Sequence, residues 1–183
     1  MRMSVASVLL LGCIVALTPA PVWAGRKRAT RVVAKFGGEC SGEPFRPSPR
    51  LKRMVERLRQ KTDNPCSGPY CDYAFVYDLD GDGRGEWFVR LHCGATGNCT
   101  FGIFNDYPAR NRGEIGAWFF YIHKRAGGWS ALTTYEREGG ENGVVGRYVY
   151  RKGRYVLRFY HTDLGYYHNP HPFLGRMGVP KCE

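Results

Sequence analysis

Apolar and polar residues alternate with a period of two over most of the chain from residue 73 onward. Residues 73–77 and 87–91 each place three large apolar side chains on one side of an extended segment. Glycine-containing turn signals at 125–128 and 152–153 are typical of β-hairpins. The pattern therefore predicts an antiparallel meander of about six or seven strands. Its further strands are expected within residues 117–123, 129–135, 147–151 and 154–160.

A different periodicity, typical of a helix, occurs at residues 49–61. Ser48 followed by Pro49 is a helix-start signal, and the segment 63–65 (Asp-Asn-Pro) is a stop signal. Between them, apolar residues follow at i, i+3, i+4 and i+7, whereas the opposite face is basic. The predicted fold is therefore α+β, mainly β, with one N-terminal amphipathic helix packed on the sheet. The residues of the apolar face are Leu51, Met54, Val55 and Leu58.

The first 24 residues have the pattern of a secretory signal peptide. Arg2 precedes an apolar core at residues 8–17, and Val22-Trp23-Ala24 is typical of a cleavage site. The apolar core is too short to span the membrane as a helix, and no later segment is longer. We expect cleavage after Ala24 and export to the periplasm or the extracellular medium. A lipoprotein anchored through Cys13, which ends a lipobox-like tetrapeptide, is the alternative.

The rest of the chain divides by composition. Residues 25–47 are basic and then rich in glycine and proline, and we expect them to form an irregular lead-in. Residues 48–183 are expected to form a single β-rich domain, in which glycine-rich 139–146 is predicted to be a mobile loop. The net charge of the chain is +11, which favours acidic partners.

Cysteine usage indicates an oxidising compartment. Six of the seven cysteines lie beyond the signal peptide, and an even number in an exported chain is typical of a disulfide framework. The absence of any Cys-x-x-Cys pair argues against a zinc site. Two local disulfides and one that joins the two ends of the domain are expected: Cys66–Cys71, Cys93–Cys99 and Cys40–Cys182.

A cluster of carboxylates lies between the first two alternating runs. Asp78, Asp80, Asp82 and Glu86 occupy positions 1, 3, 5 and 9 of a glycine-rich loop, and Arg84 at position 7 can offer its carbonyl. Calcium prefers oxygen ligands arranged in this way. The valine at position 12 excludes an EF-hand, which has a glutamate there. The spacing predicts a structural calcium site, with a metal-free Asp/Gly turn as the alternative.

Residues 77–89 resemble the Asp-x-Asp-x-Asp-Gly-x-x-Asp/Glu calcium loops of FG-GAP and VCBS-type β repeats. In those families the ligands lie between two strands, so the resemblance implies calcium binding by the same carboxylates. The families repeat the loop in successive blades, whereas this chain has a single copy. The resemblance therefore implies the cation role of the loop and not a propeller fold. The loop followed by the segment 93–99 is also similar to exported bacterial proteins.

Two further groups of residues are candidates for chemistry. Three histidines near the C-terminus could bind a transition metal, although packing within an aromatic loop is the alternative. They are His161, His168 and His171. Residues 147–160 interleave cations with aromatic rings, which suits an anionic polymer, an envelope component or an acidic protein surface, with nucleic acid as a further alternative. The predicted anion-binding cations are Arg147, Arg151, Lys152, Arg154 and Arg158.

Together these patterns favour an exported, disulfide-stabilised, non-enzymatic binding domain with a structural calcium loop. Two other functions are compatible with the same residues. The first is a metal-dependent hydrolase that uses the C-terminal histidines or the acidic loop. The second is a secreted enzyme inhibitor that presents the segment 139–146.

Overall fold

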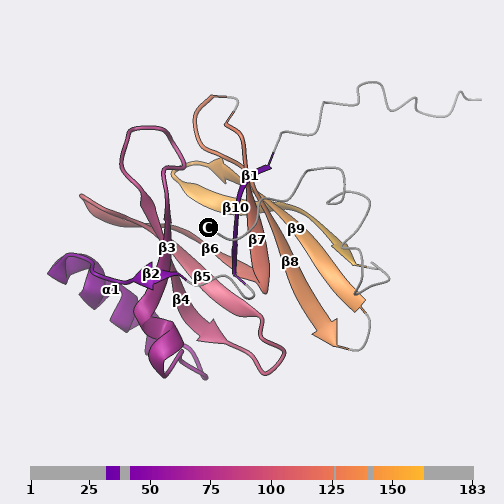
Figure 1. Cartoon of the computed structure of the whole chain (residues 1–183), viewed down its shortest axis with the longest axis horizontal. Helices are drawn as coiled ribbons and strands as arrows, with labels where there is room; N and C mark the ends of the chain where they lie inside the picture. Colours follow the sequence, from indigo (N-terminus) through magenta and orange to yellow (C-terminus); the bar gives the residue numbers. More distant parts are fainter. Residues whose placement is uncertain (1–31, 38–41, 126, 140–141, 163–183) are drawn as a thin grey trace, which may run out of the picture.

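Two five-stranded antiparallel sheets form the body of the protein (Figure 1). The computed structural model describes residues 32–37, 42–125, 127–139 and 142–162. Sheet A, in the order β1-β7-β8-β9-β10, contains β1 (Val32–Gly37), β7 (Phe119–His123), β8 (Leu132–Gly139), β9 (Asn142–Arg151) and β10 (Arg154–Thr162). Sheet B, in the order β2-β3-β4-β5-β6, contains β2 (Glu43–Pro44), β3 (Tyr73–Tyr77), β4 (Glu86–Cys93), β5 (Cys99–Asp106) and β6 (Ala109–Ala117).

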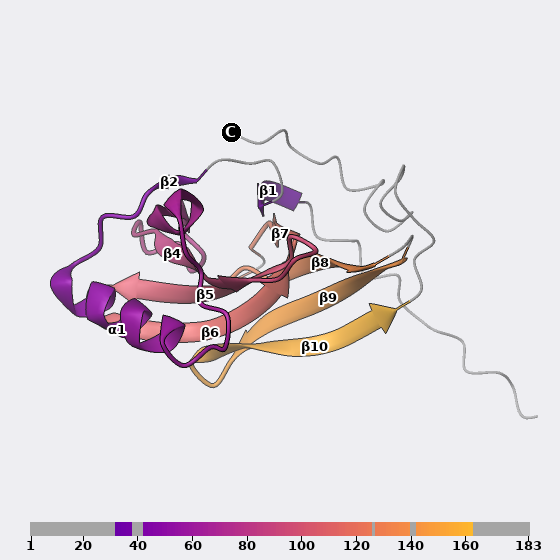
Figure 2. The same ribbon diagram turned by 90° about the horizontal axis from the view of Figure 1, so that it is seen from below.

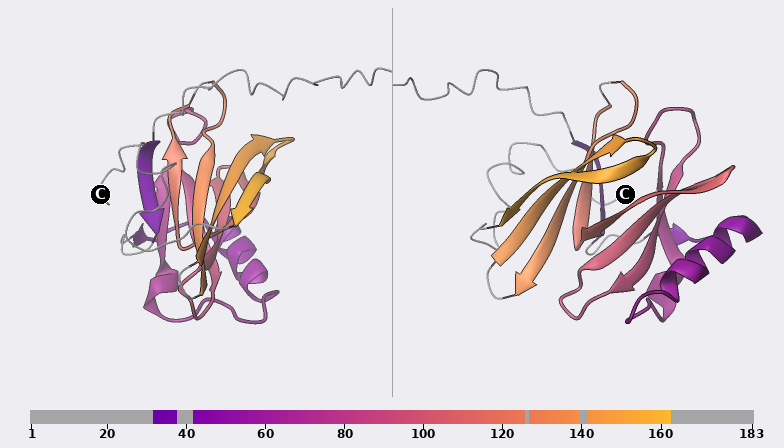
Figure 3. Two further views of the ribbon diagram at one scale, coloured as in Figure 1. Left: turned by 90° about the vertical axis from the view of Figure 1, so that its right-hand side faces the viewer. Right: turned by 180° about the vertical axis from the view of Figure 1, so that it is seen from behind.

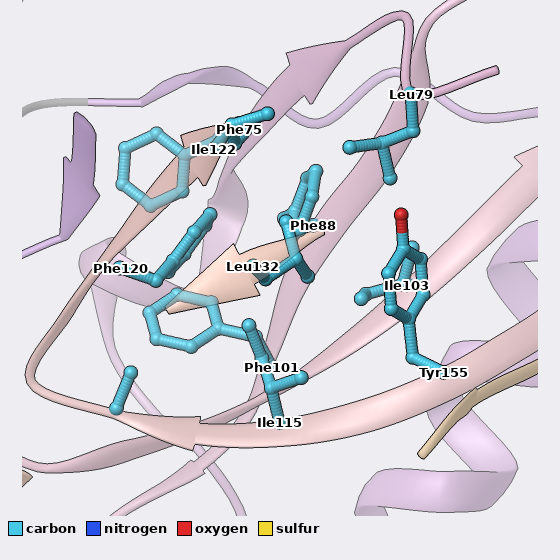
Figure 4. Close-up of a cluster of buried hydrophobic side chains, with 11 residues drawn as sticks. Phe75, Leu79, Phe88, Phe101, Ile103, Ile115, Phe120, Ile122, Leu132 and Tyr155 are labelled. Carbon is cyan, nitrogen blue, oxygen red and sulfur yellow. The ribbon is translucent and has the colours of Figure 1, made fainter. Parts of the chain in front are cut away.

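The two sheets pack face to face around an aromatic core, as Figure 4 shows. Sheet B contributes Phe88 and sheet A contributes Phe120, whose rings stack with their centroids 4.8 Å apart. Alternation along the strands explains this core, because every second residue of a strand points to the same face. The other fully buried core residues are Phe75, Leu79, Phe101, Ile103, Ile115, Ala117, Ile122, Leu132 and Tyr155.

The helix α1 (Pro49–Arg59) covers the other face of sheet B. Its apolar face buries Leu51 and Val55 against strands β4, β5 and β6, and Figure 3 shows the helix on the side away from sheet A. Ser48 caps the helix through a bond from the Leu51 N–H to its hydroxyl. Asp106 at the end of β5 accepts from both the N–H and the hydroxyl of Ser48, which ties the helix start to sheet B.

At one side of the molecule, the edge strands of the two sheets meet. Figure 2 shows β10 beside β6, and the contact is closest where Gly113 lies against the backbone of Tyr155. A β-carbon at Gly113 would lie 2.9 Å from the Tyr155 carbonyl oxygen, and its φ of 125° is also one that favours glycine. Glycine at this position therefore allows the two sheets to close on each other.

The fold class expected from the sequence, mainly β with one N-terminal helix, is confirmed. The strands exceed the expected six or seven, because the chain also forms the hairpin of β5 and β6 and two strands in the segment 25–47. The expectation of an irregular lead-in at 25–47 is therefore wrong for β1 and β2. The prediction of a mobile loop at 139–146 is also wrong, because β8 extends to Gly139 and β9 begins at Asn142. The buried valines of this segment favour a strand more strongly than its glycines oppose one.

Both local disulfides are confirmed. They join Cys66 to Cys71 and, across the hairpin of β4 and β5, Cys93 to Cys99. Cys40 and Cys182 lie outside the described residues. Two disulfides indicate a non-cytoplasmic, oxidising compartment. In the part of the chain that the structure describes, no helix is long and apolar enough to cross a membrane.

Candidate functional site

The acidic loop joins β3 to β4, whose ends pair at Tyr77 and Glu86. Asp78 organises the turn, because its carboxylate accepts hydrogen bonds from the N–H groups of Gly81 and Gly83. Both glycines have positive φ values, 77° and 85°, which few other residues adopt readily. The sequence therefore folds this loop around its own first carboxylate.

Three of the predicted ligands come together at this loop. The carboxylate oxygens of Asp78, Asp80 and Glu86 offer one ligand atom each within 4.8 Å of one another, so the cluster could hold a metal ion. Asp82 is not part of this cluster; its exposed carboxylate accepts a hydrogen bond of 2.8 Å from the Arg84 N–H. A ligand set made only of carboxylates suits hard cations such as calcium or magnesium.

Glu86 is the buried member of the cluster, with no exposed surface. Its Oε2 accepts from the Leu79 N–H at 2.7 Å, and its Oε1 accepts from the Asn105 side-chain amide at 2.7 Å. The Asn105 carbonyl oxygen accepts in turn from the Arg112 guanidinium. Asn105 and Arg112 carry no signal in the sequence near the acidic loop, because they belong to β5 and β6 and reach Glu86 only through strand pairing. This chain of donors polarises the Asn105 amide toward an ionised Glu86.

Burial of the Glu86 carboxyl disfavours its ionised form. Desolvation, with smaller contributions from the neighbouring Asp80, Asp82 and Asp78, raises the pKa of Glu86 to about 7, although the Leu79 N–H acts in the opposite direction. A buried carboxylate next to other carboxylates is stable when a proton or a cation lies between them. A proton or a metal ion at this cluster would therefore offset the charge of Glu86.

The loop is fastened to the opposite sheet. Leu79 is fully buried in the core between the sheets, and its carbonyl accepts a 2.7 Å hydrogen bond from the Ser130 N–H. The Ser130 carbonyl accepts from the Tyr155 hydroxyl of β10, also at 2.7 Å. On the outside, the Arg125 guanidinium packs against the backbone at Gly81. The loop is thus hydrogen-bonded to the β7–β8 connection of sheet A and, through Ser130, to β10.

The five cations of the predicted basic surface do not all lie in the same environment. Four of its cations are exposed and make no hydrogen bond or ion pair with a described residue: Arg151, Lys152, Arg154 and Arg158. The two-residue turn at Lys152 and Gly153, both with positive φ, places the first three of them at the tip of the β9–β10 hairpin. These three cations line, together with Val156, a hollow of about 520 Å³.

Arg147 does not belong to that surface, so this part of the prediction is wrong. Its guanidinium is half-buried, donates to the Thr133 hydroxyl at 2.9 Å and contacts the ring of His123. Burial lowers the pKa of Arg147 from its ordinary value. The sequence could not show this, because the pairing of β9 with β8 places Arg147 opposite Thr133. Its side chain therefore points toward β7 and β8 rather than toward solvent.

The proposed histidine site falls mostly beyond the described chain. His161 lies on β10, and His168 and His171 lie outside the described residues.

A scan against protein-family models, a search of curated proteins and a search of solved structures each found no match.

Proposed function

We propose that this protein is an exported, non-enzymatic binding domain whose basic β9–β10 tip holds an anionic partner. The observation that carries the proposal is the grouping of Arg151, Lys152 and Arg154 around one hollow without an ion pair to any described residue. Unpaired cations on a surface attract acidic polymers over long range, and the attraction weakens as salt rises. The two disulfides favour an envelope polymer or an extracellular acidic surface over nucleic acid.

The test is the binding of a sulfated polysaccharide to the full chain at increasing salt. Arg151→Gln combined with Arg154→Gln should weaken binding about tenfold and reduce the salt dependence. The matched control is Arg53→Gln combined with Arg57→Gln, which removes the same charge from the exposed face of α1. Equal losses in both double variants would show that net charge alone binds the polymer, and the proposal would be wrong.

We further propose that Asp78, Asp80 and Glu86 hold a calcium ion that stabilises the scaffold. The support is the convergence of three carboxylates at a loop that also contacts the opposite sheet. An ion bound to the folded state alone raises stability as its concentration rises. Calcium should therefore raise the melting temperature of the parent protein.

The loop itself offers a matched pair of variants for this test. Asp80→Ala should abolish calcium binding measured by calorimetry, whereas Asp82→Ala should retain it, because the Asp82 carboxylate lies outside the cluster. Loss of binding in neither variant, or no binding to the parent at millimolar calcium, would contradict this site. Magnesium and manganese, titrated in the same way, would show whether the site selects calcium.

A further inference from the structure

A second hollow lies beside the acidic loop, between the start of α1 and the turn that joins β5 to β6. It has a volume of about 600 Å³, which is within the usual range for small-ligand pockets. Three segments that are far apart in the sequence line it: 46–49, 84–85 and 105–107, together with Val76 and Trp87. The hollow is separate in its lining from the basic tip of the β9–β10 hairpin.

Most polar groups in this hollow are already satisfied. Asp106, the one carboxylate of the lining, accepts from the N–H and the hydroxyl of Ser48 through its two oxygens. The Asn105 side chain donates to Glu86 and accepts from Arg112. These groups shape the wall, but their hydrogen-bonding capacity is largely used within the protein.

Two cations of the lining remain available. Arg46 and Arg84 are exposed, and their guanidinium groups make no hydrogen bond or ion pair with any residue that the structure describes. Arg46 precedes α1, whereas Arg84 belongs to the acidic loop, so the fold brings them to one hollow from 38 positions apart. A guanidinium binds carboxylate or sulfate oxygens through parallel N–H donors.

Two aromatic rings accompany these cations. Trp87 is half-buried and packs edge-on against Phe45, with 5.4 Å between the ring centroids, so its position is fixed. Tyr107, in the turn after β5, is 71% exposed, the largest value among the exposed large apolar residues of the described chain. A ring left in solvent beside unpaired cations offers a planar apolar surface to a ligand.

We propose that this hollow binds an acidic saccharide, that is, a sugar ring that bears a carboxylate or a sulfate. Arg46 and Arg84 would pair with the anionic group, and Trp87 and Tyr107 would cover the apolar face of the ring. An inorganic anion would use the guanidinium groups alone, and a neutral sugar would use the rings alone. The two disulfides indicate a non-cytoplasmic, oxidising compartment, which favours a polysaccharide ligand over a nucleic acid.

The hollow is also linked to the proposed calcium site, and this link rests on the function proposed above. Arg84 is held by the acidic loop through its N–H bond to Asp82, and Asn105 lines the hollow while it binds Glu86. An ion that orders the loop would fix Arg84 and the wall at Asn105. Calcium should therefore strengthen saccharide binding, and the saccharide should strengthen calcium binding by the same factor.

Calorimetry on the full chain tests the hollow with four probes: a tri-uronate, a sulfated tetrasaccharide, the neutral maltotriose and inorganic sulfate. The parent should bind one equivalent of an acidic saccharide and bind maltotriose and sulfate at least tenfold more weakly. Arg46→Gln and Arg84→Gln should each weaken binding about tenfold, and Tyr107→Ala several-fold. Arg110→Gln, an exposed arginine outside the lining, is the matched control and should change affinity less than twofold.

The variants separate this proposal from the one above. If Arg151→Gln with Arg154→Gln removes binding of the short saccharides while the hollow variants retain it, the ligand binds the hairpin tip and the hollow proposal is wrong. If the parent binds none of the acidic saccharides, the hollow proposal also fails, whatever the long polymer does. In millimolar calcium, Asp80→Ala should bind the acidic saccharide several-fold more weakly than the parent. Equal affinities would refute the link between the two sites.

Discussion

In the absence of metal ions, the stability of the protein should fall as the pH rises through the titration range of Glu86. Its pKa is about 7 in the folded protein, against 4.5 for an ordinary glutamate, so the folded state binds the proton more tightly than the unfolded state. The stabilising contribution is therefore complete below about pH 4.5 and is lost as the pH rises to about 7. A shift of this size corresponds to about 3 kcal/mol, of which roughly 2 kcal/mol falls between pH 5 and 7.5.

Urea unfolding in the presence of a chelator, at several pH values from 5 to 7.5, measures this effect. Glu136, whose pKa burial also raises, contributes to the same slope, so the parent alone is not sufficient. Glu86→Gln removes the titration of Glu86 and leaves the other groups in place. The difference in pH slope between parent and variant isolates the contribution of Glu86.

Calcium should change the sign of the effect. An ion that binds the carboxylates competes with the proton, so the stabilisation by calcium should grow between pH 5 and 7.5 in the parent and should be lost in the Gln variant. The reasoning would be refuted if parent and Glu86→Gln showed the same pH slope in the chelator. The reasoning would also be refuted if, in the chelator, the free energy of unfolding of the parent rose relative to that of the variant as the pH increased.

Three further predictions concern the scaffold, and each is checked by urea unfolding. Serine at both Cys93 and Cys99 should cost about 2 kcal/mol, since the bridge closes a short loop across one hairpin. The reduced parent should be less stable than this variant, because reduction also opens Cys66–Cys71. Ser48→Ala should cost about 1 kcal/mol, and Asp106→Asn less, because an amide can still accept from the cap. Gly113→Ala should cost about 1 to 3 kcal/mol, because its β-carbon would press on the backbone of β10; no loss would contradict the close sheet contact.

The sequence was sufficient for the elements whose signals are local. The helix at Pro49–Arg59 follows from the cap, the apolar spacing and the stop signal, and the β9–β10 turn follows from Lys152-Gly153. The sequence pattern did not predict the hairpin of β5 and β6, because β6 carries arginines and glycines where a strand usually shows apolar alternation. Only the aromatic core, assembled from both sheets, makes that segment a strand, and such long-range packing is not readable from a short window.

The acidic loop shows the same division between local and long-range information. The spacing of the carboxylates indicated a cation site, and three of the four come together. What spacing could not show is that Glu86 is fully buried and bonded to Asn105, because that depends on the pairing of β4 with β5. The surface prediction failed at Arg147 for a related reason, since strand register decides which face of the sheet a side chain occupies.

Hydrogen bonds join the acidic loop to two other parts of the fold. Glu86 accepts from the Leu79 N–H, whose own carbonyl accepts from the Ser130 N–H, and Asn105 joins Glu86 to the wall of the hollow. A hairpin turn that only reversed the chain would not need a buried carboxylate with a perturbed pKa, because solvated aspartates and glycines make such turns unaided. The cost of burying Glu86 is therefore best explained if a cation or proton at this loop sets how firmly the two sheets and the wall of the hollow are held.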